Sequence, residues 1–540
     1  NDNFFELGGH SLLGTQLVFR LSQTFAIDFS IQSLFEHPTV AKLSVAIESA
    51  IRRTTAQTAS CIQRVSRDEY LPLSFAQQRL WFLDRLEDGK SATYNMPTAL
   101  YLTGSLQIEA LEQSIAEIVR RHEVLRTTFP TVNSSPVQAI AEQPQLQLTR
   151  VDLQGLTPDL QTAEVHRLAT EEAHSPFDLA NGPLLRVTLL KLGEQSHVLL
   201  VTIHHICSDG WSVAIYTREL SILYQAFSTD APSPLPELPI QYADFAYWQH
   251  QWLKSSELDR QLAYWQQQLQ DAPPVLNLPN DYPRKTAQSF RGNAQAFTLA
   301  PDLCKELTVL SRKTETTLFM VLFAVFGIVL HYYSAQDDLV LGTDVANRNR
   351  AETEGLIGFF VNQLPLRLDF SGNPTFNKEL LGRVRERALE AYANQDLPFD
   401  RLVEKLNVER TLSYNPVFQA KLVLQNTPRM DLELPGLTIK RLVVENETAS
   451  YDLLLNVEET EQGFECSLRY STDLFKPTTI TRIVEHFQMV LQTVVTQPDL
   501  QLTELEKLLA DTDRQQQLQA EQEIEKVTLQ KLKGRRRREA

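Results

Sequence analysis

The chain carries two adjacent histidines in the stretch Val201-Thr202-Ile203-His204-His205-Ile206-Cys207-Ser208-Asp209-Gly210-Trp211. The run from His197 to Ile206 is apolar on both faces, which indicates a strand buried within a sheet. Because side chains alternate along a strand, His205 shares a face with Val201 and Ile203, while His204 lies on the opposite face. We therefore predict that the two imidazole rings point in opposite directions.

The same stretch contains four side chains that could bind a metal: His204, His205, Cys207 and Asp209. Adjacent strand residues cannot easily chelate one ion, and no further ligand with metal-like spacing follows, so we predict no metal. A bare pair of histidines is also compatible with two buried core residues. The cysteines have no CxxC pair, which indicates neither a disulfide scaffold nor a zinc site and fits a reducing cytoplasm; they are Cys61, Cys207, Cys304 and Cys466.

Apolar helical runs and strand-like runs are mixed on both sides of the histidines, from about residue 70 to residue 509. Four prolines between residues 232 and 239 favour an extended connector. We therefore predict two lobes of mixed α+β and α/β structure, residues 70–230 and residues 231–509. The apolar run from Leu318 to Leu330 is shorter than the roughly 18 residues that cross a bilayer, and it predicts a buried helix.

The two ends of the chain differ in composition from the lobes. Residues 1–51 have the spacing of three short helices, and residues 52–69 are dominated by Thr, Ser, Gln and Arg, which predicts a linker. Residues 510–540 form a charged, helical tail that ends in a basic cluster from Lys531 to Arg538, either a solvated tether or a docking element for an acidic partner. No signal peptide follows Asn1, and we expect the chain to be part of a longer protein.

The charge balance restricts the class of partner. The 540 residues include 67 acidic and 51 basic side chains, a net charge of −16, which argues against nucleic acid or an anionic membrane as the main partner. With 43% hydrophobic and 22% charged residues, the composition is that of an ordinary globular protein. We expect small-molecule or protein partners.

A serine stands at the start of the first predicted helix. Ser11 could simply cap that helix. The stretch Asp2-Asn3-Phe4-Phe5-Glu6-Leu7-Gly8-Gly9-His10-Ser11-Leu12-Leu13 resembles the phosphopantetheine attachment site of peptidyl carrier domains in nonribosomal peptide synthetases. The resemblance implies that Ser11 carries a covalent 4′-phosphopantetheine, added by a phosphopantetheinyl transferase, and a phosphodiester suits a helix N-terminus. Such carriers usually have a further helix before the motif, so we expect an incomplete, poorly stable helical bundle.

The histidine stretch has the pattern HHxxxDG and resembles the active-site motif of condensation domains, which are relatives of chloramphenicol acetyltransferase. Six further blocks follow the order found in that family: Ser74 to Phe82, Arg121 to Phe129, Tyr242 to Trp248, Ile357 to Asn362, Asn394 to Asp400 and Asn415 to Gln419. The resemblance covers nearly all of residues 70–505 and implies the family's two-lobed fold. Together the two resemblances imply a nonribosomal peptide synthetase fragment.

The resemblance implies an enzyme that forms peptide bonds. The carrier, served by an upstream adenylation domain, presents a donor aminoacyl or peptidyl thioester, and a downstream carrier presents the acceptor amino acid. The implied catalytic residues are His205, His204 and Gly210. His205 faces the tunnel and either accepts a proton or aims the amine, His204 mainly supports stability, and the Gly210 N–H can stabilise the oxyanion. The block from Ala76 to Trp81 resembles domains that accept an L-configured donor.

Asp209 invites two interpretations. Its carboxylate could orient the imidazole as in a catalytic triad, or act as an acid in its own right. In related condensation domains an arginine at the position of Arg186 pairs with the motif's aspartate. The resemblance therefore implies that Asp209 and Arg186 form a structural ion pair, which holds the loop from Asp209 to Trp211 in place.

Two alternative functions stay open at this point. One is an acyltransferase of the same fold that uses coenzyme A or a carrier-bound acyl group, and Ser11 weighs against it. The other is a non-catalytic module that binds or recruits carriers, and the intact HHxxxDG pattern weighs against it. The sequence leaves the donor, the acceptor and the final product open.

Overall fold

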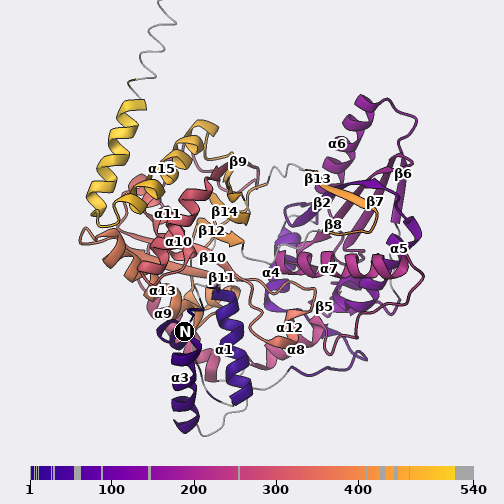
Figure 1. Cartoon of the computed structure of the whole chain (residues 1–540), viewed down its shortest axis with the longest axis horizontal. Helices are drawn as coiled ribbons and strands as arrows, with labels where there is room; N and C mark the ends of the chain where they lie inside the picture. The colour runs from indigo at the N-terminus through magenta and orange to yellow at the C-terminus, as the bar shows by residue number, and fades with distance from the viewer. Residues whose placement is uncertain are drawn as a thin grey trace, which may run out of the picture.

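The computed structural model describes residues 2–4, 7, 9, 11–25, 27, 29, 31–53, 62–86, 89–143, 148–252, 256–408, 411–425, 432–442, 448–460, 462–516 and 518. The basic cluster predicted at the end of the tail lies outside these residues, as does Cys61. Figure 1 shows two lobes side by side, with a smaller helical unit at the N-terminus.

The first lobe is built on a five-stranded sheet in the order β13-β2-β8-β7-β6. Its strands are β2 (Asn95–Gly104), β6 (Leu148–Asp152), β7 (Leu185–Gly193), β8 (Ser196–His204) and β13 (Leu437–Leu442). Helices α5 (Ile108–Arg121) and α7 (Gly210–Phe227) pack with the face that contains Leu199 and Val201. Helix α6 (Pro158–His174) packs with the face that contains Val198 and Leu200. Both faces of β8 are covered, which explains its unbroken apolar sequence.

The central strand β8 ends earlier than its apolar pattern predicts. It pairs antiparallel with β2 and β7 as far as His204. Residues His205–Cys207 form one turn of 3-10 helix, and α7 begins at Gly210. The Ile206 N–H donates to His204 Nδ1 over 3.1 Å, and this local hydrogen bond replaces a strand hydrogen bond. His205 therefore stands in a turn at the end of the strand.

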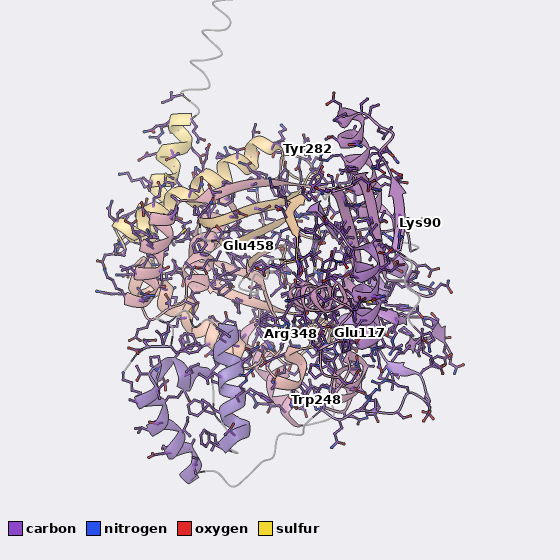
Figure 2. All side chains as sticks on the ribbon, turned by 45° about the vertical axis from the view of Figure 1, so that its right-hand side comes forward. Lys90, Glu117, Trp248, Tyr282, Arg348 and Glu458 are labelled. Carbon is purple, nitrogen blue, oxygen red and sulfur yellow. The ribbon has the colours of Figure 1, made fainter. Side chains whose placement is uncertain are left out.

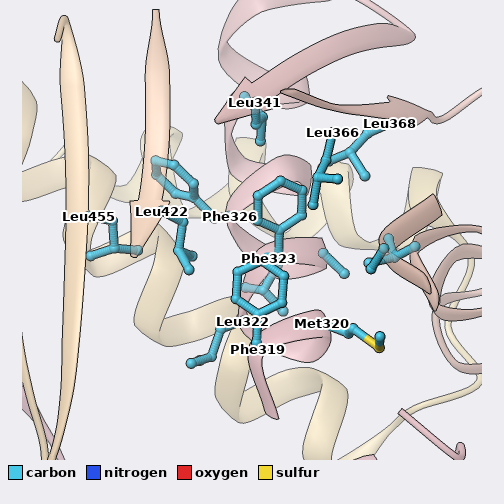
Figure 3. Packing of buried hydrophobic residues seen from close by; sticks show 14 of the residues in the cluster. Phe319, Met320, Leu322, Phe323, Phe326, Leu341, Leu366, Leu368, Leu422 and Leu455 are labelled. Carbon is cyan, nitrogen blue, oxygen red and sulfur yellow. The ribbon is translucent and has the colours of Figure 1, made fainter. Parts of the chain in front are cut away.

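The second lobe contains a six-stranded mixed sheet in the order β11-β10-β12-β14-β15-β9. These strands are β9 (Gly292–Leu299), β10 (Asp338–Val345), β11 (Asn362–Asp369), β12 (Ala420–Gln425), β14 (Leu453–Thr460) and β15 (Gly463–Ser471). Helix α11 (Leu318–Ser334) is buried from Phe319 to His331, which confirms the predicted core helix. Figure 3 shows its phenylalanines packed against leucines of the sheet.

Further helices complete the second lobe and the junction between the lobes. They are α4 (Phe75–Leu86), α8 (Tyr242–Trp252), α9 (Ser256–Gln268), α10 (Pro301–Lys313), α12 (Ala351–Glu354), α13 (Leu381–Tyr392), α14 (Phe399–Leu406) and α15 (Pro477–Thr496). A small sheet combines β1 (Leu71–Pro72), β3 (Thr127–Thr128), β4 (Thr131–Val132) and β5 (Ser135–Ile140). Among the described residues no single helix has the length and apolar character of a membrane span; α10 and α11 reach it only as a pair bent by 102°.

The boundary between the lobes is interwoven along the sequence. Strand β13, which lies in the range predicted for the second lobe, pairs antiparallel with β2 of the first lobe. In Figure 1 it is the orange strand within the purple lobe. Residues Leu356, Ile357 and Phe360 also belong to the apolar core of the first lobe. A cut at residue 231 therefore separates the lobes less cleanly than the proline-rich connector predicts.

The N-terminal unit consists of α1 (Ser11–Phe25), α2 (Ile31–Glu36) and α3 (Val40–Arg53). Helices α1 and α2 approach closely at Gly14, where a Cβ would lie 3.0 Å from Ile31 Cδ1. The buried side chains of the unit form one continuous apolar cluster with those of the second lobe. Helix α2 contacts α13, and Arg385 lies 6.0 Å from the centre of the Phe35 ring. The unit is therefore seated on the second lobe.

The described part of the predicted linker is held against the first lobe. Ile62 is buried in the core of that lobe. Arg67 donates to Asp244 over 2.7 Å and to Glu123 over 2.9 Å, and the Val65 N–H donates to Asp244 over 2.9 Å. These contacts anchor the chain shortly before β1.

Candidate active site

His205 lies at the junction of the two lobes, in the turn after β8. Its backbone N–H donates to the Tyr94 carbonyl over 2.8 Å, and its Nδ1 lies 2.7 Å from the carbonyl oxygen of Ser208. A carbonyl oxygen can only accept, so Nδ1 carries the proton and Nε2 of the neutral ring keeps a free lone pair. The edge of the ring meets Phe359, with the ring centres 4.8 Å apart. His205 is half-buried, and its orientation is fixed by these contacts.

His204 occupies a different environment. It is buried, its ring meets Phe177 edge-on at 5.8 Å, and its Nδ1 accepts from the Ile206 N–H. Burial, together with the positive charges of the nearby His205 and Arg186, lowers the pKa of His204 to about 3. The ring is therefore neutral at physiological pH and serves as a core residue. The predicted separation of the two rings is consistent with these surroundings.

Asp209 caps the N-terminus of α7 and is fully buried. Its Oδ1 accepts from the Ser212 N–H at 2.8 Å, the Ser212 hydroxyl at 2.7 Å and Arg348 Nη2 at 3.0 Å. Its Oδ2 accepts from the Phe360 N–H at 3.0 Å. These four hydrogen bonds direct the carboxylate away from His205, whose Nδ1 is bound to Ser208. The geometry favours a structural role for Asp209.

The partner of Asp209 is Arg348, so the expected pair with Arg186 is wrong. Arg348 follows β10 of the second lobe and is fully buried. Its Nη1 donates to the carbonyls of Thr353 and Leu356 over 2.8 and 2.6 Å. Figure 2 labels Arg348 near the middle of the molecule. Burial lowers the pKa of this guanidinium, and the Asp209 carboxylate opposes that shift.

Arg186 is used elsewhere in the first lobe. It lies on β7, next to the histidine strand as predicted, and pairs there with Thr202 of β8. Its Nε, however, donates to Glu172 of α6 over 2.6 Å. Its guanidinium also stacks on Phe177 at 3.7 Å. The α6 face of the sheet takes up this side chain, whereas Asp209 lies beyond the end of the strand and reaches the second lobe instead.

Residues 356–360 of the second lobe are held by groups of the first lobe. The Ile357 N–H donates to His122 Nδ1 over 3.2 Å, and the Gly358 N–H donates to the Ser212 hydroxyl over 3.0 Å. Tyr242 donates from its hydroxyl to the Phe359 carbonyl over 2.6 Å. With the bond from the Phe360 N–H to Asp209, these contacts fix the backbone that places Phe359 against His205.

Gly210 is exposed and begins α7, so its N–H has no acceptor within the helix. A Cβ on Gly210 would lie 3.7 Å from Gln425 Oε1 at the end of β12, an ordinary van der Waals contact. The glycine therefore faces the second lobe across a narrow space. The space around Gly210 would admit a Cβ, so steric crowding alone does not explain why this residue is a glycine.

A pocket opens between the lobes next to this site. Residues from both lobes line it: Ser74, Ala76, Arg79, Phe245, Gln249, Asn347, Phe359, Phe360, Val361, Asn362, Gln363, Pro398, Phe399 and Asp400. Arg79 donates to Gln363 over 2.7 Å and lies 3.7 Å from Asp400. Phe359 is both a wall of this pocket and the aromatic neighbour of His205. Across the described residues, no three His, Cys, Asp or Glu side chains gather as metal ligands.

Comparison with known proteins assigns the family. The model of the condensation domain matches residues 67–518. The chain belongs to the condensation domain family. The model of the phosphopantetheine attachment site matches residues 1–47, so these residues are the carrier domain with its attachment site. Condensation domains of nonribosomal peptide synthetases are amide-forming acyltransferases, and this chain is a carrier and condensation fragment of such a synthetase.

The curated relatives are synthetases. A linear gramicidin synthase protein of Brevibacillus parabrevis is 46% identical over 523 residues, which cover 96% of this chain and 7% of the relative. A second protein of the same synthase is 47% identical over 517 residues, covering 95% and 10%. Malpinin synthetase of Mortierella alpina is 43% identical over 514 residues, covering 95% and 6%. The chain spans a tenth or less of the length of these relatives.

Solved structures confirm the predicted two-lobed fold. The X-domain from teicoplanin biosynthesis matches with a TM-score of 0.76 and 29% identity, over 82% of this chain and 99% of that chain. The holo form of a four-domain nonribosomal peptide synthetase, bound to AMP and glycine, matches with a TM-score of 0.72 and 23% identity, over 84% of this chain and 34% of that chain. The second likeness shows the fold alone.

The carrier domain offers a suitable place for phosphopantetheine. Ser11 is the first residue of α1, a helix of 15 residues whose first N–H groups lack intrahelical acceptors and favour a phosphate. The preceding Gly9 lies against Phe4, where a Cβ would come within 2.4 Å of the ring. The described residues are therefore compatible with a phosphopantetheine group attached to Ser11. The side chain of Ser11 and all of His10 lie outside the described residues.

Sequence reasoning missed several residues around the site. Arg348, His122, Ser212 and Phe359 hold the junction, and Arg348 is separated from Asp209 by 139 positions. His122, Tyr242 and Phe359 do fall within blocks that resemble the family's motifs, which was the available signal. Arg348 lies outside those blocks, and nothing in its surroundings in the sequence distinguishes it.

Proposed function

We propose that this chain joins a donor acyl group, delivered as a thioester by its own carrier domain, to the α-amine of an acceptor amino acid on a downstream carrier. The observation that carries the proposal is the state of His205. Its Nδ1–H is bound to the Ser208 carbonyl, so Nε2 is available as a proton acceptor at the junction of the lobes.

The reaction forms one C–N bond and breaks one C–S bond. The acceptor amine attacks the donor carbonyl, and the tetrahedral intermediate expels the thiolate of the donor carrier. His205 Nε2 takes a proton from the attacking nitrogen and returns it to the leaving sulfur, or holds the amine in line for attack by a hydrogen bond. Both roles need the imidazole to stay in one orientation, which Ser208 and Phe359 provide.

Negative charge develops on the carbonyl oxygen during this attack. Gly210 begins α7, and its N–H together with the positive end of that helix can stabilise the charge. Asp209 and Arg348 keep the Gly210 N–H in place, because their ion pair fixes the N-terminus of α7 to the second lobe. We assign His204 to the stability of the strand end.

Ser11 holds the cofactor in this proposal. When bound, 4′-phosphopantetheine supplies the thiol to which the donor is attached. The partners are a phosphopantetheinyl transferase, an upstream adenylation domain and a downstream carrier domain of the same assembly line, in the cytoplasm and without nucleic acid or membrane. The block from Ala76 to Trp81 supports an L-configured donor.

The recruitment alternative has one observation in its favour. The X-domain from teicoplanin biosynthesis, which covers 83% of this chain, has been solved in complex with OxyB. The arrangement of His205 argues for catalysis in this chain instead, since a platform for recruitment does not need an imidazole with a fixed tautomer.

Reconstitution tests the proposal against both alternatives. The full chain is loaded on Ser11 with an aminoacyl phosphopantetheine and mixed with a loaded acceptor carrier, and the carriers are analysed by intact-protein mass spectrometry. We expect a dipeptidyl acceptor carrier and no loading when Ser11 is replaced by Ala. Product from acyl coenzyme A but not from loaded Ser11 would indicate the acyltransferase, and no product from any donor would favour recruitment.

A further inference from the structure

The carrier domain meets the condensation domain at a short acidic and basic segment, residues 348–354. Arg20 of α1 donates from Nη2 to both carboxylate oxygens of Glu354, over 2.8 and 2.6 Å. The Arg20 side chain is 58% exposed and that of Glu354 is 25% exposed. This pair lies at the surface, where ion pairs are weak and reversible. A weak, reversible ion pair suits a carrier domain that binds the condensation domain and then dissociates from it.

A second contact of the same segment uses aromatic rings. The guanidinium of Arg350 lies 5.3 Å from the centre of the Phe19 ring of the carrier and 4.2 Å from that of Trp248 in α8. One cation thus joins a ring of the carrier to a ring of the condensation domain, and both distances are within the range of cation–π attraction. Figure 2 labels Trp248 at the lower part of the molecule, toward the carrier helices.

The inner side of this segment is part of the active-site support. Arg348 holds Asp209 and also binds the carbonyl of Thr353. The indole N–H of Trp211, two residues after Asp209, donates to the Glu354 carbonyl over 3.1 Å. Glu354 therefore contacts the carrier through its carboxylate and the HHxxxDG stretch through its backbone.

We propose that residues 348–354 are the docking site at which this chain's own carrier delivers the donor, and that Glu354 and Arg350 are positioning residues which tie the docked carrier to the loop that follows His205. The inference rests on the proposed function, because it takes the carrier as the source of the donor. It adds the surface and the residues by which the carrier is recognised.

Charge reversal in the full chain tests the docking site. The variants are Arg20→Glu, Glu354→Arg and the double reversal, which recreates the pair with the charges exchanged. The matched control is Glu112→Arg, which breaks the comparably exposed pair with Arg150 on the first lobe. The first measurement is hydrogen exchange of the α1 and α2 amides, which does not depend on activity. The second is peptide-bond formation from a donor on Ser11 and from a free pantetheine thioester.

We expect each single reversal to speed exchange in α1 and α2 by about fivefold, as for loss of a surface ion pair. Coupling from the loaded carrier should fall by a similar factor in both single variants, and the double reversal should restore both readouts. Arg20→Glu, which changes only the carrier, should keep the parental rate of coupling from the free thioester. Parental exchange and parental carrier-bound coupling in both single variants would overturn the docking site. Failure of the parent chain with both donors would instead overturn the proposed function.

Discussion

Asp209 and Arg348 are the two residues on which the junction of the lobes depends most. Both are fully buried, and each binds further groups besides its partner. Removing one partner leaves the other charge buried with neither a partner nor water around it. Removing both partners leaves no buried charge. The same logic does not apply to Arg186, whose pair with Glu172 is partly exposed.

We therefore expect Asp209→Ala and Arg348→Ala each to lower the free energy of unfolding by about 3 to 5 kcal/mol. The double variant should lose clearly less than the sum, because the residues are in contact. Arg186→Ala is the control. Loss of its ion pair should lower the free energy of unfolding by no more than about 1 kcal/mol, and loss of its stacking on Phe177 adds to this. Urea unfolding followed by far-UV circular dichroism measures all four proteins. An Asp209→Ala protein as stable as the parent would return Asp209 to a chemical role.

His204 gives a pH dependence of known sign. Its pKa in the folded chain is about 3, against an ordinary value of 6.5, so the unfolded chain binds one more proton between these values. The stability contributed by neutral His204 is complete above about pH 6.5 and is lost as the pH falls toward 3, by roughly 1 kcal/mol per pH unit.

The matched variant is His204→Asn, which keeps a side-chain acceptor for the Ile206 N–H but does not titrate. We expect it to start from a lower stability and to lose less on acidification from pH 6.5 to pH 4.5 than the parent. Equilibrium unfolding at several pH values provides the comparison. Equal slopes for the two proteins would show that His204 is not the titrating group.

At the scale of elements, the segment 356–360 is the part that links His205 to both lobes. Gly358 lies against the ring of Tyr242, where a Cβ would come within 2.0 Å of Cδ2. Tyr242 is buried and bound to Ser74 and Phe359, so it has little freedom to move. The nearby Gly355 has a φ of −92° and open space at its Cβ position.

Gly358→Ala should therefore destabilise the chain by about 1 to 3 kcal/mol through overpacking and should displace Phe359 from His205. Gly355→Ala, three residues earlier, should be neutral or slightly stabilising. The two variants are compared by their melting temperatures and by their rates of peptide-bond formation. If Gly358→Ala melts and reacts like Gly355→Ala, the segment does not position His205.

Much of this element arrangement could be predicted from sequence, and the remainder depends on long-range contacts. The run from His197 to Ile206, apolar on both faces, predicts a strand buried within a sheet, and the run from Leu318 to Leu330 predicts a buried helix, because the local pattern reports burial. The partner of Asp209 could not be found in this way, since Arg348 is 139 positions distant and belongs to another lobe. The pairing of β13 with β2 could not be predicted either, because alternation identifies a strand and not its neighbours.

For the whole molecule, three further connections among the described residues act together with residues 356–360 to hold the lobes in register around His205. The first is the buried pair of Asp209 and Arg348. The second is the exchange of β13 into the first sheet. The third is the contact of α4 with α14, where Arg401 stacks on Phe75 at 4.6 Å. A reaction at the junction of two lobes needs such connections, because a shift of about 1 Å in the reacting groups can cost a hundredfold in rate.

The most direct test of the account is single-turnover peptide-bond formation by His205→Ala, with the donor on Ser11 and the acceptor on a separate carrier. His204→Asn serves as the matched control, and the thermal unfolding of each variant verifies folding. We predict that His205→Ala unfolds like the parent but forms product at least about a hundredfold more slowly, while His204→Asn keeps a rate within a few-fold of the parent. A well-folded His205→Ala protein that forms product at the parental rate would contradict the account.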